Sequence, residues 1–249
     1  MKIYLSDGTP DGFLTALDCA LNAGPDAMAA EAAAGTQGTL FDTTECVAAK
    51  PDAAARLLAL AGGRISPGAA RRVYYAALSE VPRAIETALA YLRLGLELGA
   101  AVDDFQADGR VRRMQALAAR VGGEIHRLKG LIRFRALDSG SWWAPIEPDH
   151  RVLLPVAFHF RRRMPGERWS LHDVRRGWAV AWDGRSLREA RASDLWDSGA
   201  PRLDPNESAF EDLWRSFFRR IAVPGRENPM LQARNLPRRY WKYLVELCE

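Results

Sequence analysis

The stretch that decides the fold class is WSLHDVRRGWAVAWDGRSLREA, residues 169–190. It consists of three short runs rich in Trp, Val, Leu and Ala, with turn residues between them. Asp183-Gly184 is a strong hairpin signal, because a two-residue hairpin turn needs residues that tolerate positive φ. The stretch therefore predicts a meander of three antiparallel strands.

Two more strands are expected upstream of this meander. Ile132 and Phe134 alternate with Arg133 and Arg135, which is typical of a strand with one buried face. Ser139-Gly140 then reads as a turn that leads into a return strand. The expected sheet is antiparallel and comprises residues 130–136, 141–146, 168–174, 177–183 and 185–190.

Helices are expected to flank this sheet. Pro155 suits the first turn of a short helix over 155–163, and the three arginines in its last turn complement the helix dipole. Apolar residues at helical spacing predict another helix that ends near Ile221. A basic tail punctuated by prolines and ending in one more short helix completes this part of the chain.

The N-terminal part reads as mainly helical, because apolar residues recur at helical spacing and prolines or capping residues precede the runs. The expected helices are 13–21, 51–61, 67 onward, 82–98 and 110–121, with short strands at 2–5 and 43–49 and an Ala- and Gly-rich loop at 22–38. The sequence thus predicts an α+β protein: a helical N-terminal lobe followed by an antiparallel sheet flanked by helices.

Charge divides the chain near residue 109. Residues 1–109 contain 8 Lys and Arg against 14 Asp and Glu, and residues 110–249 contain 27 against 17. We expect an acidic, mainly helical lobe over 1–109 and a basic α+β portion over 110–249 that holds all 8 Trp, joined in one continuous compact unit. A basic, Trp-rich portion is a candidate surface for a polyanion, and a solvated sheet face is the simpler alternative.

Composition excludes several classes of protein. The chain is 48% hydrophobic and 27% charged, as is usual for a globular protein. No apolar run approaches the roughly 20 residues that span a bilayer, and the first residues do not resemble a secretory signal. Cys19, Cys46 and Cys248 are scattered, which argues against a disulfide framework and against a paired-Cys metal site. We expect a cytoplasmic protein without membrane contact.

Basic and aromatic residues gather in short segments of the second part. On a strand, Arg133 and Arg135 would lie on one face about 7 Å apart, close to the spacing of phosphates along a single strand. Near the C-terminus, Tyr240 and Trp241 could stack on bases, or they could dock into the core instead. The candidate nucleic-acid-binding residues are Arg127, Lys129, Arg133, Arg135, Arg161, Arg162, Arg175, Arg176, Arg238, Arg239, Tyr240, Trp241 and Lys242.

Carboxylates and imidazoles are also close together in the sequence. An imidazole beside carboxylates can move a proton near neutral pH. The spacing matches neither H-x-x-x-H nor H-E-x-x-H, so we expect no metal and no cofactor. These groups would share one cleft if the strand that ends near residue 174 runs in the same direction as 141–146, which the sequence leaves open. The candidate catalytic residues are His126, Glu147, Asp149, His150, His172 and Asp173.

Several motifs together resemble a known bacterial family. They are Tyr4-Leu-Ser-Asp-Gly8, His126-Arg-Leu-Lys-Gly-Leu-Ile-Arg-Phe-Arg135, Ile146-Glu-Pro-Asp-His150, His172-Asp-Val-Arg-Arg-Gly177 and Pro237-Arg-Arg-Tyr-Trp-Lys-Tyr-Leu244. The family has no known activity and is described as probable DNA metabolism or DNA repair proteins. Its members are encoded beside a radical-S-adenosylmethionine protein or fused to a uracil-DNA-glycosylase-like domain. The resemblance covers nearly the whole chain, departs from the family at residues 22–38 and implies no catalytic residue.

Three functions therefore compete. The first is an accessory protein that binds single-stranded or damaged DNA for a radical-S-adenosylmethionine partner, with a uracil-DNA-glycosylase-like protein as a further partner that the resemblance implies. The second is a nucleotide- or DNA-processing enzyme that uses the His, Asp and Glu side chains. The third is an adapter that binds only protein, and it predicts an exposed apolar patch.

Overall fold

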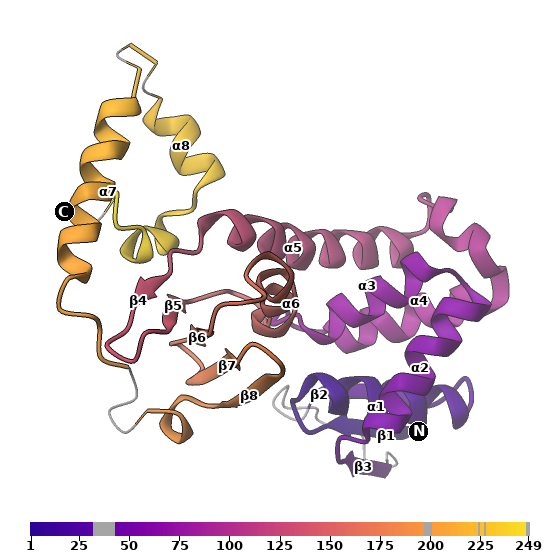
Figure 1. Cartoon of the computed structure of the whole chain (residues 1–249). Coiled ribbons are helices and arrows are strands. Elements are labelled where there is room, and N and C mark those ends of the chain that lie inside the picture. Colours follow the sequence, from indigo (N-terminus) through magenta and orange to yellow (C-terminus); the bar gives the residue numbers. More distant parts are fainter. Residues whose placement is uncertain (32–42, 197–200, 224, 227, 248–249) are drawn as a thin grey trace. The chain divides into compact units, whose positions relative to one another are not determined.

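The computed structural model describes residues 1–31, 43–196, 201–223, 225–226 and 228–247 (Figure 1). The chain divides into two compact units, Met1–Gly123 and Glu124–Glu249. The change of net charge after residue 109 falls at the start of helix α5 (Gly109–Leu131), whereas the boundary between the units lies within that helix. Helix α5 therefore contributes residues to both units.

The first unit combines a small parallel sheet with helices. Strand β1 (Lys2–Ser6) lies between β2 (Met28–Glu31) and β3 (Thr43–Val47) and is parallel to both. Parallel neighbours need a crossover connection, and helix α1 (Pro10–Asn22) provides it between β1 and β2. The elements that follow are α2 (Pro51–Arg64), α3 (Pro67–Ala77), α4 (Ala84–Leu98), a 3-10 helix (Gly99–Asp104) and the first part of α5.

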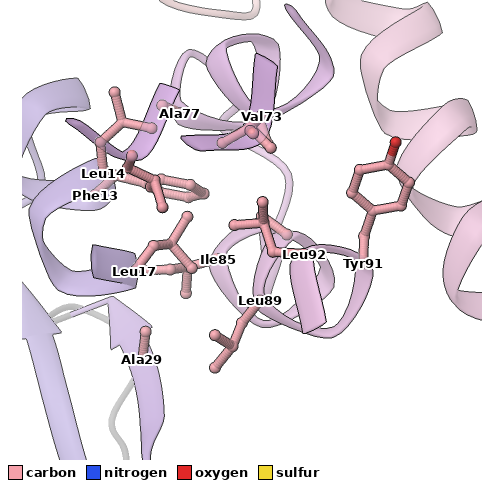
Figure 2. Close-up of a cluster of buried hydrophobic side chains, with 14 of the residues drawn as sticks. Phe13, Leu14, Leu17, Ala29, Val73, Ala77, Ile85, Leu89, Tyr91 and Leu92 are labelled. Carbon is pink, nitrogen blue, oxygen red and sulfur yellow. The ribbon is translucent and has the colours of Figure 1, made fainter. Parts of the chain in front are cut away.

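The core of this unit forms where α1 meets α4 (Figure 2). Leu17 of α1 and Ile85 and Leu92 of α4 are at most 1% exposed. Figure 2 shows Leu17 and Ile85 close together, with Ala29 of β2 below them. Burying a side chain of this size stabilises the fold by about 1.5–3 kcal/mol, so the helical spacing seen in the sequence is a core pattern.

Most elements expected in this unit are confirmed, with one correction. The strands expected at 2–5 and 43–49 correspond to β1 and β3, and the expected helices correspond to α1 to α5. The loop expected at 22–38 is wrong at 28–31, which form β2; the rest of that loop, from residue 32, lies outside the described residues. Alanine has a low strand propensity, so the residues Met-Ala-Ala-Glu do not predict a strand. They form one because they pair with β1 and because Ala29 is buried.

Gly12, in the first turn of α1, packs closely against the turn that follows β1. A Cβ at Gly12 would lie 1.9 Å from Oδ1 of Asp7, and the Asp7 carboxylate accepts hydrogen bonds from the backbone N–H groups of Thr9 and Ala49, each at 2.9 Å. We expect Gly12→Ala to displace this carboxylate and lower the free energy of unfolding by about 1–3 kcal/mol, measured by denaturant titration with circular dichroism. Gly63→Ala in α2 is the control, because its Cβ would meet no atom within 4 Å. Equal midpoints for the two variants would contradict this prediction.

The second unit is built on a five-stranded sheet in the order β4-β5-β6-β7-β8. The strands are β4 (Arg135–Ala136), β5 (Trp142–Ile146), β6 (Trp169–Asp173), β7 (Trp178–Trp182) and β8 (Leu187–Arg191). The last four correspond to strands expected from the sequence, and the hairpin at Asp183-Gly184 is confirmed. The α+β class is therefore correct.

The expectation of a wholly antiparallel sheet is wrong. Strands β5 and β6 are parallel, with Ala144 opposite Leu171, and the other three pairs of neighbours are antiparallel. Helix α6 (Leu153–Arg163) accounts for the difference, because a helix between two neighbouring strands carries the chain back to the starting edge of the sheet. The sequence predicts this helix at 155–163. Because the helix lies between β5 and β6, it also indicates that the two strands are parallel.

The strand expected at 130–136 is also largely wrong. Helix α5 continues to Leu131, and only Arg135 and Ala136 pair with β5. Val121, Ile125 and Leu128 are buried at helical spacing and extend the apolar side of α5 through the basic stretch. The alternation over 132–135 is too short to outweigh this pattern.

The C-terminal segment of the second unit is helical. Helix α7 (Glu207–Ile221) includes the helix expected to end near Ile221. Helix α8 (Pro229–Asn235) and a 3-10 helix (Arg238–Tyr243) follow it. Among the described residues, no helix is long and apolar enough to cross a bilayer.

Candidate nucleic-acid interface

The candidate catalytic residues after β5 and at the end of β6 meet at one edge of the sheet. In the parallel pair, Ile146 lies opposite Asp173, so the segment Glu147–His150 leaves the sheet beside Asp173. Arg176 joins the two segments: it forms an ion pair with Asp173 at 2.8 Å and donates to the backbone oxygen of Asp149 at 2.8 Å. The strand direction that the sequence left open is thus the one that brings these residues together.

A buried carboxylate that the sequence reasoning missed organises the same edge. Glu124 of α5 is 1% exposed and accepts hydrogen bonds from the backbone N–H groups of Asp149 and His150, both at 2.8 Å. The hydroxyl of Tyr240 donates to it at 2.6 Å. Glu124 lies between Val121 and Leu128 on the apolar side of α5, and an acidic residue on an apolar stripe was the signal that could have revealed it.

Residues near the C-terminus form ion pairs with two other carboxylates at this edge, those of Asp149 and Glu147. Arg239 forms an ion pair with Asp149 at 2.7 Å, and Lys242 forms one with Glu147 at 2.5 Å. The Lys242 ammonium and the hydroxyl of Tyr243 lower the pKa of Glu147, so this carboxyl group is ionised at neutral pH. Burial and then the hydrogen bond to Glu124 raise the pKa of Tyr240 to about 12. The network thus holds the segment Arg239–Tyr243 against the β5–α6 loop.

His126 stands apart from this network. Its side chain is exposed, and it follows Glu124 by two residues on α5. Two residues correspond to about 200° of rotation around a helix, so His126 projects from nearly the opposite side of α5. The structure brings Glu147, Asp149, His150 and Asp173 together around Glu124 and Arg176, and it leaves His126 outside.

His172 lies on the sheet between two indole rings. It is 4% exposed, and its ring centroid lies 6.1 Å from that of Trp143 and 5.3 Å from that of Trp196. Within the described part of the chain, neither Nδ1 of His172 nor Nε1 of Trp143 has a hydrogen-bond partner. Leaving such buried groups unpaired costs about 1–3 kcal/mol each, which is the cost that a site for a polar ligand would recover on binding.

The buried imidazole predicts a pH dependence. Burial lowers the pKa of His172 from its ordinary value of 6.5, although Asp173 opposes the shift. Below that value the unfolded chain binds a proton that the folded chain does not, so the free energy of unfolding falls as the pH drops through about 6.5. We expect His172→Gln to reduce this fall. Trp fluorescence during urea titration at several pH values measures it, and an unchanged pH dependence would contradict the prediction.

Many of the cations expected to bind nucleic acid are held by carboxylates. Arg133 pairs with Glu246 at 2.6 Å, and Arg135 pairs with Glu211 at 3.1 Å. The other cations held in this way are Arg176, Arg239 and Lys242. A guanidinium already bound to a buried carboxylate is a poor phosphate ligand, because binding phosphate would leave that carboxylate unpaired.

The remaining candidates differ in exposure. Tyr240 is 3% exposed, so its ring is not available for stacking, and Trp241 donates its Nε1–H to the backbone oxygen of Leu236 at 3.0 Å. Arg127 and Lys129 are half-buried on α5. The exposed candidates are Arg161, Arg162, Arg175 and Arg238.

An open groove of about 580 Å³ lies on the five-stranded sheet. Its floor includes Ser170 of β6, Ala181 of β7 and Arg188 of β8, which are direct neighbours across the three strands. Side chains alternate between the two faces of a sheet, so the side chains of this row and those of Trp169 and Leu171 point to opposite faces. Helix α6 packs on the face of Trp169, because the ring centroids of Phe160 and Trp169 are 6.3 Å apart. His172 and Trp143 belong to the same face as the groove floor.

Three arginines that the sequence reasoning did not single out line this groove: Arg168, Arg188 and Arg202. All three are exposed, and none has an ion-pair partner among the residues that the structure describes. Arg168 donates to the backbone oxygen of Ser139 at 3.2 Å. The indole of Trp196 is half-exposed and lines the same groove. We call the groove with these arginines and Trp196 the sheet groove.

The arrangement can bind an anion with an aromatic part. Guanidinium groups without carboxylates are available to phosphate oxygens, and one hydroxyl of the hydrogen-bonded pair Ser139 and Ser141 can donate a further hydrogen bond. Among the described residues, the acidic lining is limited to Asp138 and Asp183. Asp183 accepts hydrogen bonds from the backbone N–H groups of Arg185 and Ser186, each at 2.7 Å. Among the described residues, no three His, Cys, Asp or Glu side chains could hold a metal ion together.

Comparison with known proteins gives one family match. The family described as Domain of unknown function (DUF4130) matches residues 82–246, which include the last helices of the first unit and nearly all of the second. No curated protein matches the chain, and no solved structure matches it.

Proposed function

The chain belongs to the DUF4130 family, and from its own geometry we propose that it is a DNA-binding accessory protein that holds a single strand in the sheet groove. The observation that carries this proposal is the presence of three exposed arginines in one groove without acidic partners among the described residues. Elsewhere in the same unit, arginines such as Arg133 and Arg135 are bound to carboxylates. The contrast supports a phosphate-binding role for the groove arginines.

Stacking and polar contacts complete the proposed site. Bases stack on aromatic side chains with about 1–3 kcal/mol each, and Trp196 offers its half-exposed indole in the same groove as the arginines. A single strand exposes the bases that such stacking needs, whereas a duplex hides them. The groove is therefore suited to single-stranded DNA, or to a damaged site where a base has left the stack.

The proposal also includes a radical-S-adenosylmethionine protein as partner, and the support for this partner does not come from the groove. The resemblance to the family of probable DNA repair proteins is what supports a radical-S-adenosylmethionine protein as the enzyme that acts on the bound DNA. In this arrangement the chain has no turnover of its own and positions the substrate. Reconstitution of the two proteins with damaged DNA tests this step: the reaction should be faster with this protein present, and an unchanged rate would contradict the accessory role.

DNA binding itself is tested by fluorescence anisotropy with labelled oligonucleotides at several salt concentrations. Each phosphate contact on a single strand contributes about −0.7 to the slope of log K against log salt, so three arginine contacts predict a slope near −2. Single-stranded oligonucleotides should bind more tightly than duplexes of the same length. Undetectable binding at low salt, or binding that does not depend on salt, would overturn the proposal.

A further inference from the structure

Helix α7 exposes its apolar side chains. Phe210, Leu213, Trp214, Phe217 and Ile221 recur at helical spacing, and their exposed fractions are 62%, 66%, 40%, 50% and 57%. Single exposed apolar residues are normal, but a continuous row of five large ones is typical of an interaction surface. We call this row the α7 stripe.

The polar side of α7 contacts its own unit, and Trp214 of the stripe also does so, because its Nε1–H donates to Glu246 at 2.9 Å. Glu207 accepts a hydrogen bond from the backbone N–H of Ala136 at 2.9 Å, and Glu211 forms an ion pair with Arg135 at 3.1 Å. Both partners belong to β4. A surface helix normally does the reverse, burying its apolar side and exposing its polar side. The orientation of α7 therefore leaves most of the stripe uncovered by the described residues of its own unit.

The charges along α7 indicate which partner would cover the stripe. Of its exposed charges, Asp212, which also pairs with Arg215 of the same helix, lies in the acidic first half, and Arg219 and Arg220 lie in the basic second half. Glu207 and Glu211 are held by β4 and do not face outward. Packed helices lie about 8–10 Å apart, close to the Debye length at physiological salt. In an antiparallel pair of α7 helices, the acidic half of each would lie beside the basic half of the other, and the two helix dipoles would oppose.

We propose that the chain forms a homodimer in which the α7 stripes of two copies pack antiparallel around a twofold axis. The stripe is centred between residues 215 and 216, so Phe210 of one copy is level with Ile221 of the other, and Trp214 is level with Phe217. Leu213 is level with Phe218, so every position of the stripe is level with an apolar residue of the other copy, as a self-complementary interface requires. This proposal does not depend on DNA binding.

Neighbouring side chains can enlarge this contact. Val223 and two residues of α8, Met230 and Leu231, are 54%, 85% and 51% exposed. A stable interface usually buries about 800 Å² on each partner, more than one row of side chains on a four-turn helix provides. We therefore expect the segment after α7 to contribute to the dimer as well.

Sedimentation velocity over a range of protein concentrations tests the dimer. Wild-type protein should sediment as a dimer that dissociates on dilution, and Leu213→Glu and Phe217→Glu should each weaken dimerisation by at least tenfold. Both side chains are at least half exposed, so the variants should keep the fold, which circular dichroism verifies. Phe158→Glu is the matched control, because Phe158 is 42% exposed on α6 and lies outside the stripe.

A second variant tests the direction of packing. Replacing both Arg219 and Arg220 with alanine should weaken an antiparallel dimer several-fold, because each basic half loses attraction to an acidic half. In a parallel dimer the same change would remove repulsion and strengthen the association. A protein that stays monomeric at every concentration, a dimer insensitive to the stripe variants, or a dimer strengthened by the arginine replacements would overturn the proposal.

Discussion

Replacing Arg168, Arg188 and Arg202 together with alanine is expected to lower the affinity for single-stranded DNA about a hundredfold at physiological salt, if each lost contact contributes about 1 kcal/mol. The slope of log K against log salt should fall in magnitude by about 2, since each contact on a single strand contributes about 0.7. All three side chains are exposed, and none is held by a carboxylate among the described residues, so the fold should not depend on them. Anisotropy titrations at several salt concentrations give both quantities.

Two control variants separate the sheet groove from charge in general. Replacing the same three arginines with lysine keeps the charge, so the salt slope should return while part of the affinity stays lost, because lysine cannot contact phosphate in the bidentate way. Replacing Arg161, Arg162 and Arg163 with alanine removes the same charge from α6, on the other face of the sheet. An equal loss of affinity in this α6 variant would place the DNA on α6. That result would agree with the nucleic-acid-binding role that the sequence predicts for Arg161 and Arg162.

The second sheet was largely predictable because its signals are local. Trp-rich runs, the Asp183-Gly184 turn and the proline at the start of α6 each act within a few residues. The direction of β6 relative to β5 depends on the connection between them, so the local signals of each strand do not reveal it; it follows only when α6 is taken as the crossover between the two strands. Strand β2 could not be found at all, since four residues without strand propensity become a strand only through pairing with β1.

The arginines show a different limit of sequence reasoning. Arg133 and Arg188 look alike in the sequence, but Arg133 is bound to Glu246, a residue 113 positions away, and Arg188 has no acidic partner in the described chain. Long-range partners decide whether a cation is available, and clustering along the chain does not reveal them. Arg168, Arg188 and Arg202 are dispersed in sequence and meet only because β6, β8 and the segment before α7 border the same groove.

Of the six candidate catalytic residues, Glu147, Asp149, His150 and Asp173 lie at one edge of the sheet, around Glu124, which the sequence reasoning missed. The positions of Glu147 to His150 follow from the β5–α6 connection, which the sequence indicated. The burial of Glu124 does not follow from the sequence if a strand is expected from residue 130, because α5 in fact continues to Leu131. Once α5 is extended to Leu131, the acidic residue at position 124 falls on the apolar side of the helix, and its burial requires partners.

Glu124→Ala is expected to lower the free energy of unfolding of the second unit by about 3–5 kcal/mol, because it removes one side of a buried charged network. Two backbone N–H groups, those of Asp149 and His150, and the hydroxyl of Tyr240 would lose their acceptor. All 8 Trp lie in the second unit, so denaturant titration followed by Trp fluorescence reports its unfolding. A loss of this size is a large part of the stability of a domain.

Graded variants show whether the network or the volume of the side chain is responsible. Glu124→Gln keeps the volume but replaces one acceptor oxygen with a donor that faces a backbone N–H, so we expect an intermediate loss. Tyr240→Phe removes only the hydrogen bond of 2.6 Å and should cost about 1–2 kcal/mol. Glu97→Ala, at an exposed position of α4, should have little effect. If Glu124→Ala were no more destabilising than Glu97→Ala, the carboxylate would not hold the β5–α6 loop and the C-terminus together, because those partners would be satisfied equally well without it.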